Sequence, residues 1–217
     1  MLKAAIVYVQ GSAGNLLSRT LSLSEQTVAI VPKSLAVEQP TLALTAAERF
    51  ALYNNWNSDN WTKTEKDIGI WYRTGDQDFV NYELSPLGLI DQFHPEQFET
   101  ENRQQVLWNN INSWQHLIFI KYQANSLDTI IKLAELKRKD LSHRKQIVNS
   151  ELDAFDSLTS AHTGITVNWE DMQQLGSYLE CIANVSQQLN IAVDPRWATT
   201  LWTSWRQATD TLLNNYE

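Results

Sequence analysis

The sequence predicts an α/β protein with a three-layer α/β/α arrangement, in which a mainly parallel sheet lies between two layers of helices. Short apolar runs alternate along the chain with longer segments of helical periodicity. Some of these runs are continuously apolar, as expected of strands that are covered on both faces. We expect all 217 residues to form a single domain, with an insertion or lid near residues 57–105 and a helical C-terminal part.

The chain opens with a strand, a turn of small residues and a helix. Residues 3–9, KAAIVYV, predict a buried strand, and Gln10 to Gly14 interrupt it. Asn15 is a suitable N-cap for a helix that ends near Ser24, with Arg19 facing solvent. Backbone N–H groups at such a turn can bind an anion. The same pattern also suits a tight turn that binds no ligand.

Strand and helix patterns continue to the end of the chain. Further strands are predicted at residues 27–31, 68–74, 79–84, 116–122 and 164–169. Helices are predicted at residues 46–56, 101–114, 126–159 and 170–189, and from Pro195 onward. Residues 85–100 contain two prolines and a glycine, and they are predicted to form a loop or lid.

Composition limits the classes of function. The one cysteine, Cys181, excludes an intrachain disulfide and a cysteine-built metal site, and no His, Asp and Glu spacing indicates a metal centre. The net charge of −8 argues against nonspecific binding to nucleic acid or to anionic lipid. No apolar run approaches the roughly 20 residues of a membrane-spanning helix, and no signal peptide is recognised, so we expect a cytoplasmic protein.

Tryptophan is unusually abundant, with nine tryptophans against seven glycines. Aromatic rings usually fill a core or line an interface, and we favour core packing over a stacking platform for a base or sugar. Three tryptophans recur at helical spacing in the C-terminal helix, at residues 197, 202 and 205. They could pack on the chain's own core or on a partner, so the sequence leaves a homo-oligomer open.

Three segments, taken in chain order, resemble the motifs of sulfotransferases. Residues 11–19, GSAGNLLSR, resemble the loop that receives the 5′-phosphosulfate of 3′-phosphoadenosine 5′-phosphosulfate. Residues 118–133, IFIKYQANSLDTIIKL, are similar to the second motif of the family, with Lys121 and Thr129 at the positions of its Arg and Ser. Residues 165–172, ITVNWEDM, are similar to its strand and acidic turn. The resemblance extends over most of the chain.

The resemblance implies a P-loop-type topology, a small-molecule nucleotide ligand and no metal. It implies that the first loop binds the 5′-phosphosulfate through Gly11, Ser12, Ala13, Gly14, Asn15, Leu16, Ser18 and Arg19. Lys121 and Thr129 would bind the 3′-phosphate. The implied activity is transfer of the sulfuryl group to an unknown hydroxyl or amine acceptor, for which His94 is the candidate general base.

The chain also departs from the family at two positions. Sulfotransferases commonly carry Lys or Arg immediately before the small residue and glycine of the loop, and this chain has Ser12 there. The missing cation would no longer stabilise the charge that develops on the leaving phosphate. Gln123 replaces a proline of the second motif. A noncatalytic nucleotide-binding or protein-interaction module on the same fold is therefore the alternative function.

Hydrolysis of ATP or GTP is disfavoured by the same loop. A nucleoside triphosphatase would carry Lys and then Ser or Thr after the last glycine. Here Asn15 and Leu16 follow Gly14, so the side chains that bind terminal phosphates and magnesium are missing.

Overall fold

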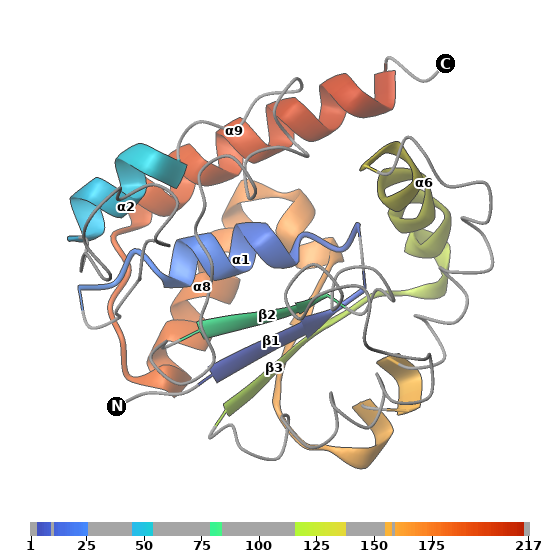
Figure 1. The fold of residues 1–217 in the computed structure, drawn as a ribbon, viewed down its shortest axis with the longest axis horizontal. Helices are drawn as coiled ribbons and strands as arrows, with labels where there is room; N and C mark the ends of the chain where they lie inside the picture. Colours follow the sequence, from blue (N-terminus) through green and yellow to red (C-terminus); the bar gives the residue numbers. More distant parts are fainter. Residues whose placement is uncertain are drawn as a thin grey trace, which may run out of the picture. The chain divides into compact units, whose positions relative to one another are not determined.

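The structure is a computed structural model that describes residues 4–9, 11–25, 45–53, 79–83, 116–137, 155–157 and 159–214 (Figure 1). Several predicted features lie outside these residues. They are the strands at 27–31 and 68–74, the loop at 85–100 with His94, the helix at 101–114 and the middle of the helix at 126–159.

Among the described residues, four strands form one sheet in the order β2-β1-β3-β4. Their bounds are β1 (Ala4–Tyr8), β2 (Phe79–Glu83), β3 (His116–Lys121) and β4 (Ile165–Asn168). β1 pairs with β3 in parallel, and β3 pairs with β4 in parallel. Most of β1 and the interior of β3 are buried, as their continuous apolar sequences predicted. The described helices and strands are therefore compatible with the α/β class, with β1, β3 and β4 running parallel.

The described residues divide into two compact units. The strand unit contains β1, the loop Gly11–Gly14, β3, the short 3₁₀ helix η1 (Ala124–Ser126), α6 (Leu127–Lys137) and β4. The helical unit contains α1 (Gly14–Leu21) from Asn15 onward, α2 (Ala46–Tyr53), the 3₁₀ helix η2 (Glu170–Gln173), α8 (Leu175–Leu189) and α9 (Pro195–Asn214).

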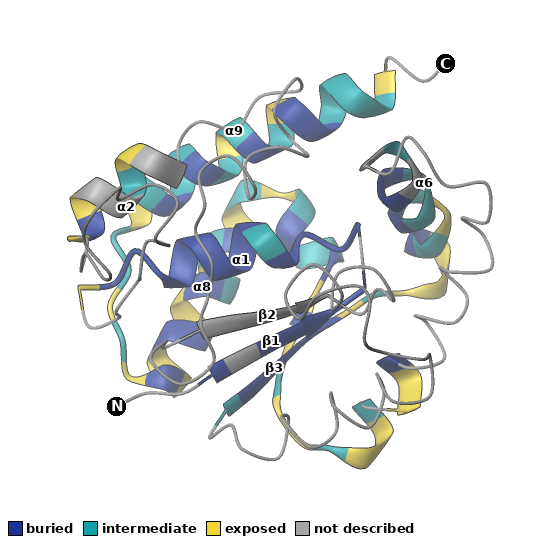
Figure 2. Cartoon of the chain, viewed as in Figure 1, coloured by how far each residue is buried: buried dark blue, intermediate teal, exposed yellow. Residues whose placement is uncertain are grey.

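Two predictions about α1 were wrong. The helix begins at Gly14, so Asn15 lies in its first turn and is not the N-cap. Arg19 was expected to face solvent, but only 5% of it is exposed. Figure 2 shows α1 buried along nearly its whole length. Serine and threonine on the polar face lower the cost of burial because they can bond locally: the Ser22 hydroxyl donates to the Ser18 carbonyl at 2.7 Å.

α9 contributes one buried face to the core of the helical unit. Ala198, Leu201 and Trp205 are buried on one face of this helix. Trp202 donates its indole N–H to the Met172 carbonyl oxygen at 2.8 Å, and Trp197 stacks on Phe50 of α2 with ring centroids 5.4 Å apart. The tryptophans of α9 thus contact the chain itself. Among the described helices, none combines the length and apolar character needed to cross a membrane.

Candidate functional site

The parallel pairing brings the carboxyl ends of three strands to one edge of the sheet. Val7 of β1 is in register with Phe119 of β3, and Lys121 of β3 is in register with Asn168 of β4. The glycine loop follows β1 directly, and Lys121 is the last residue of β3. In open α/β sheets, ligands bind outside the carboxyl ends of the strands. This edge is therefore the candidate site.

The loop after β1 is closed by hydrogen bonds to the carbonyl oxygen of Val9. The Ser12 backbone N–H donates to it at 3.0 Å, and the Ser12 hydroxyl donates to the same oxygen at 2.5 Å. Gly11 and Ala13 both have positive φ, of 93° and 66°. For alanine this left-handed conformation costs about 1 kcal/mol. The hydroxyl of Ser12 therefore stabilises the turn itself.

Gly11 lies against the backbone of α6. A Cβ atom added at Gly11 would be 2.3 Å from the Ile130 carbonyl oxygen and 3.1 Å from the Ala134 nitrogen. Since neither backbone atom can rotate away, only glycine allows this approach. The contact joins the loop to the helix that carries Thr129, one residue before Ile130.

Gly14 is enclosed by the side chain of Tyr8. A Cβ atom at Gly14 would lie 2.2 Å from two carbons of the Tyr8 ring. Tyr8 and all four loop residues are buried, with Ser12 fully inaccessible. Packing within the strand unit therefore explains both loop glycines without a ligand, which is the alternative that the sequence left open.

Lys121 and Thr129 flank the turn that follows β3. Lys121 is exposed, and its carbonyl oxygen accepts a hydrogen bond from the Trp169 N–H at 2.7 Å. This bond ties the end of β3 to the residue that follows β4. Thr129 is partly exposed in the first turn of α6. The turn between them is closed by the Ser126 N–H, which donates to the Gln123 carbonyl at 3.0 Å.

The other predicted site residues lie in α1 or outside the described residues. Leu16, Ser18 and Arg19 are buried in α1, and Asn15 is partly exposed. His94 is outside the described residues. Within the part of the chain that the structure describes, no group of three His, Cys, Asp or Glu side chains could hold a metal ion.

Sequence reasoning missed an aromatic cluster next to Lys121. The Tyr122 ring stacks on Phe155 with centroids 6.1 Å apart, and Phe119 meets Phe155 edge-on at 6.4 Å. Burial, reinforced by the nearby Asp156 charge, raises the pKa of Tyr122 to about 12. Its phenol therefore stays protonated at neutral pH. The position of Tyr122 after an apolar strand was visible in the sequence, but its partner Phe155 is distant along the chain.

The edge offers chemical groups that bind anions. They are the ammonium group of the exposed Lys121 and the hydroxyl of the partly exposed Thr129. The loop residues beside them are buried, and the Ser12 N–H is already bonded to the Val9 carbonyl oxygen. Comparisons of the chain with models of protein families, with curated proteins and with solved structures found no match.

Proposed function

We propose that this chain is a sulfotransferase-like protein of P-loop-type, three-layer topology that binds 3′-phosphoadenosine 5′-phosphosulfate and transfers its sulfuryl group to a small hydroxyl or amine acceptor in the cytoplasm. One observation carries the proposal. The first segment that resembles a sulfotransferase motif follows β1, and the other two contain most of β3 and all of β4, which are neighbouring parallel strands. Segments far apart in sequence thus meet at one edge of the sheet, which supports the proposal because ligands of open α/β sheets bind at such edges.

A bisphosphorylated nucleotide needs two anion sites. In the proposal, the backbone amides of residues 11–16 bind the 5′-phosphosulfate, and Lys121 with Thr129 binds the 3′-phosphate. The ammonium and the hydroxyl supply a charge and a hydrogen-bond donor, although lysine lacks the bidentate fork of arginine. Support comes from the contact of Gly11 with α6, since Gly11 to Gly14, Lys121 and Thr129 all belong to the strand unit.

The proposed chemistry is an in-line displacement at sulfur. The acceptor oxygen or nitrogen forms a bond to sulfur while the bond from sulfur to the phosphate oxygen breaks. The electron pair of that bond leaves with 3′-phosphoadenosine 5′-phosphate, and the acceptor proton passes to a general base. His94 is the proposed base.

A second candidate function is noncatalytic binding of the same nucleotide. One observation favours it. Position 12 carries a serine whose hydroxyl donates to the Val9 carbonyl, so this side chain neutralises no charge on a leaving group. Such a module would bind the nucleotide without turnover.

Calorimetry with 3′-phosphoadenosine 5′-phosphate tests the shared part of both candidates. We expect micromolar binding, which Lys121→Ala weakens by about tenfold or more because a charge-assisted hydrogen bond to phosphate is lost. Lys137→Ala is the matched control. It removes the same charge at the end of α6, about 12 Å along the helix from Thr129, and should leave the affinity unchanged. If the wild-type chain binds no nucleotide, both candidates are wrong.

Turnover separates the two candidates. The wild-type chain is incubated with 3′-phosphoadenosine 5′-phosphosulfate and a panel of phenols, alcohols and amines, and release of 3′-phosphoadenosine 5′-phosphate is followed. Acceptor-dependent release supports the transferase. Nucleotide binding without release supports the noncatalytic module.

A further inference from the structure

We infer that Gly11 is a positioning residue, which seats α6 against the loop and so fixes the separation of the two phosphate sites. The inference rests on the proposed function, because it assigns Gly11 a role in recognising a nucleotide with phosphates at both ends. It goes further by naming the contact that sets the spacing between those ends.

The contact itself is between two backbones. The position that a Cβ would take at Gly11 is 2.3 Å from the Ile130 carbonyl oxygen, whereas ordinary van der Waals contact begins at 3.4 Å. A methyl group at residue 11 would therefore displace the turn of α6 at Ile130 by about 1 Å. The φ of +93° at Gly11 adds a second reason for glycine at this position.

The displacement would reach the 3′-phosphate site. Thr129 immediately precedes Ile130 in α6, so a shift of this turn carries the Thr129 hydroxyl with it. We expect the loop to keep its place, because both the backbone N–H and the hydroxyl of Ser12 donate to the Val9 carbonyl oxygen. Gly11→Ala would thus change the distance between the loop and Thr129, while each group remains present.

A change in spacing has a thermodynamic signature that general destabilisation lacks. When two sites are held at the right separation, the second phosphate of a bisphosphate binds with little additional entropy cost. A variant that is merely less folded binds every native-state ligand more weakly by the same factor, which is the reciprocal of its folded fraction. The ratio of two affinities therefore reports positioning and is insensitive to stability.

The experiment compares, by calorimetry, the dissociation constants of 3′-phosphoadenosine 5′-phosphate, which is a bisphosphate, and adenosine 5′-monophosphate, which lacks the 3′-phosphate. We expect the wild-type chain to prefer the bisphosphate by about tenfold or more. In Gly11→Ala this preference should fall to about threefold or less, since a misplacement of 1 Å is costly for a site built on geometry. Gly176→Ala is the control: its Cβ position has no neighbour within 4 Å, and the preference should be unchanged.

A folded Gly11→Ala protein that keeps the wild-type preference overturns the inference and leaves the proposed function intact. If Gly11→Ala does not fold, Ala134→Val enlarges the buried side chain of the α6 residue whose backbone nitrogen faces Gly11, and the strain on this turn should also reduce the preference. An unchanged preference in that variant overturns the inference as well. A wild-type chain that binds neither nucleotide instead overturns the proposed function on which the inference rests.

Discussion

A single hydrogen bond joins two buried hydroxyl groups in the helical unit. The hydroxyls of Thr20 in α1 and Tyr178 in α8 share it, and burial raises the pKa of Tyr178 well above its ordinary value. Tyr178→Phe would leave the Thr20 hydroxyl without this partner. We expect the free energy of unfolding to fall by about 1–2 kcal/mol. Urea denaturation measures the change.

Tyr122→Phe is the matched control for that substitution. Tyr122 is only partly buried, and its ring packs on Phe155 without any need for the phenol oxygen. Loss of the Tyr122 hydroxyl should change the free energy of unfolding by less than about 0.5 kcal/mol. Equal effects of the two substitutions would contradict a stabilising role for the bond between Thr20 and Tyr178.

The thiol of Cys181 should make stability depend on alkaline pH. Burial, with a smaller contribution from the Asp171 charge, raises its pKa from 9.0 to about 12. Between these two values the unfolded chain loses the thiol proton and the native chain keeps it, so the free energy of unfolding falls as pH rises. Below pH 9 the thiol has no such effect.

Cys181→Ala should therefore lessen the decline of stability above pH 9 relative to the wild-type chain, as followed by chemical denaturation at a series of pH values. Tyr122 titrates in the same region in both proteins, so the difference between their curves isolates the thiol. Superimposable slopes would show that the thiol is not shielded in the native chain.

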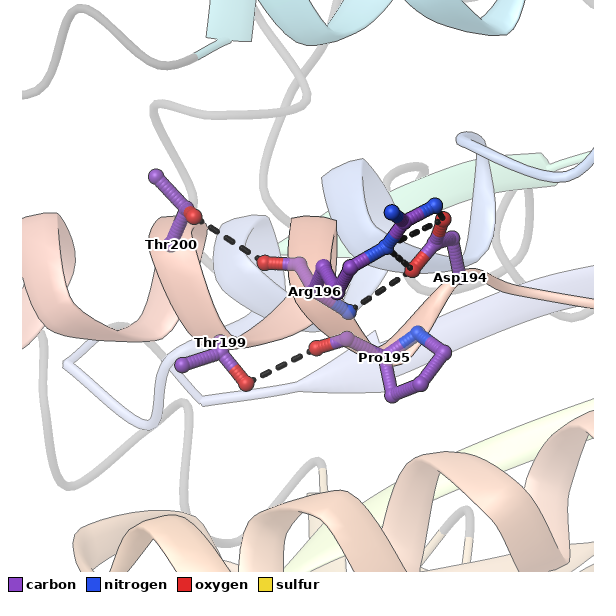
Figure 3. A network of polar contacts seen from close by, with 5 residues as sticks. All are labelled: Asp194, Pro195, Arg196, Thr199 and Thr200. Atoms are coloured by element: carbon purple, nitrogen blue, oxygen red, sulfur yellow. Dashed lines mark hydrogen bonds and ion pairs between the residues drawn. The ribbon is translucent and has the colours of Figure 1, made fainter.

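At the scale of the secondary structure element, the start of α9 is held by an aspartate cap (Figure 3). The Asp194 carboxylate accepts a hydrogen bond from the Arg196 backbone N–H at 2.8 Å. It also forms an ion pair with the Arg196 guanidinium at 2.6 Å. Pro195 occupies the first helical position, where its missing N–H is harmless. The side-chain and backbone bonds from Arg196 lower the pKa of Asp194.

Asp194→Ala should lower the melting temperature by roughly 2–4 °C at neutral pH. A lowered native pKa means that the contribution of Asp194 is complete above the ordinary aspartate value of about 4 and is lost as pH falls through the native pKa. The difference in melting temperature should therefore shrink in acid. Thr203→Ala, on the exposed face of the same helix, serves as the control and should have a much smaller effect. A difference in melting temperature that does not change with pH would contradict the role of the Asp194 carboxylate as a helix cap.

Elements with strong local signals were predictable from the sequence. The apolar runs predicted β1, β3 and β4, and Asp194 with Pro195 predicted the start of α9. The register of Lys121 with Asn168 could not be predicted, but its consequence could, since parallel strands end at the same edge. Arg19 was placed wrongly because amphipathic periodicity reports one apolar face, while α1 is buried around its circumference.

The candidate site was only partly predictable for a related reason. Its glycines stood out in the sequence as a turn between a strand and a helix. The groups that enclose those glycines could not be seen in the sequence. The Tyr8 ring over Gly14 and the Ile130 carbonyl beside Gly11 are close approaches set by packing. Sequence patterns report which residues are small, whereas tertiary packing decides what the small residue makes room for.

At the scale of the whole molecule, a ligand that binds the native state but not the unfolded state raises the free energy of unfolding of the entire fold. At one hundred times its dissociation constant, such a ligand adds about 2.7 kcal/mol. For a chain of this length that corresponds to a rise in melting temperature of roughly 5–10 °C. We expect 3′-phosphoadenosine 5′-phosphate to produce this rise in a thermal denaturation experiment.

Adenosine at the same concentration is the first control and should produce little or no shift, because it lacks both phosphates that the proposed site binds. The Lys121→Ala variant is the second. With about a tenfold weaker affinity, the same nucleotide concentration should add about 1.4 kcal/mol less stability, which reduces the rise by about half. An equal rise in the variant and the wild-type chain would show that the nucleotide binds without Lys121. The 3′-phosphate would then be recognised at a place other than the carboxyl end of β3.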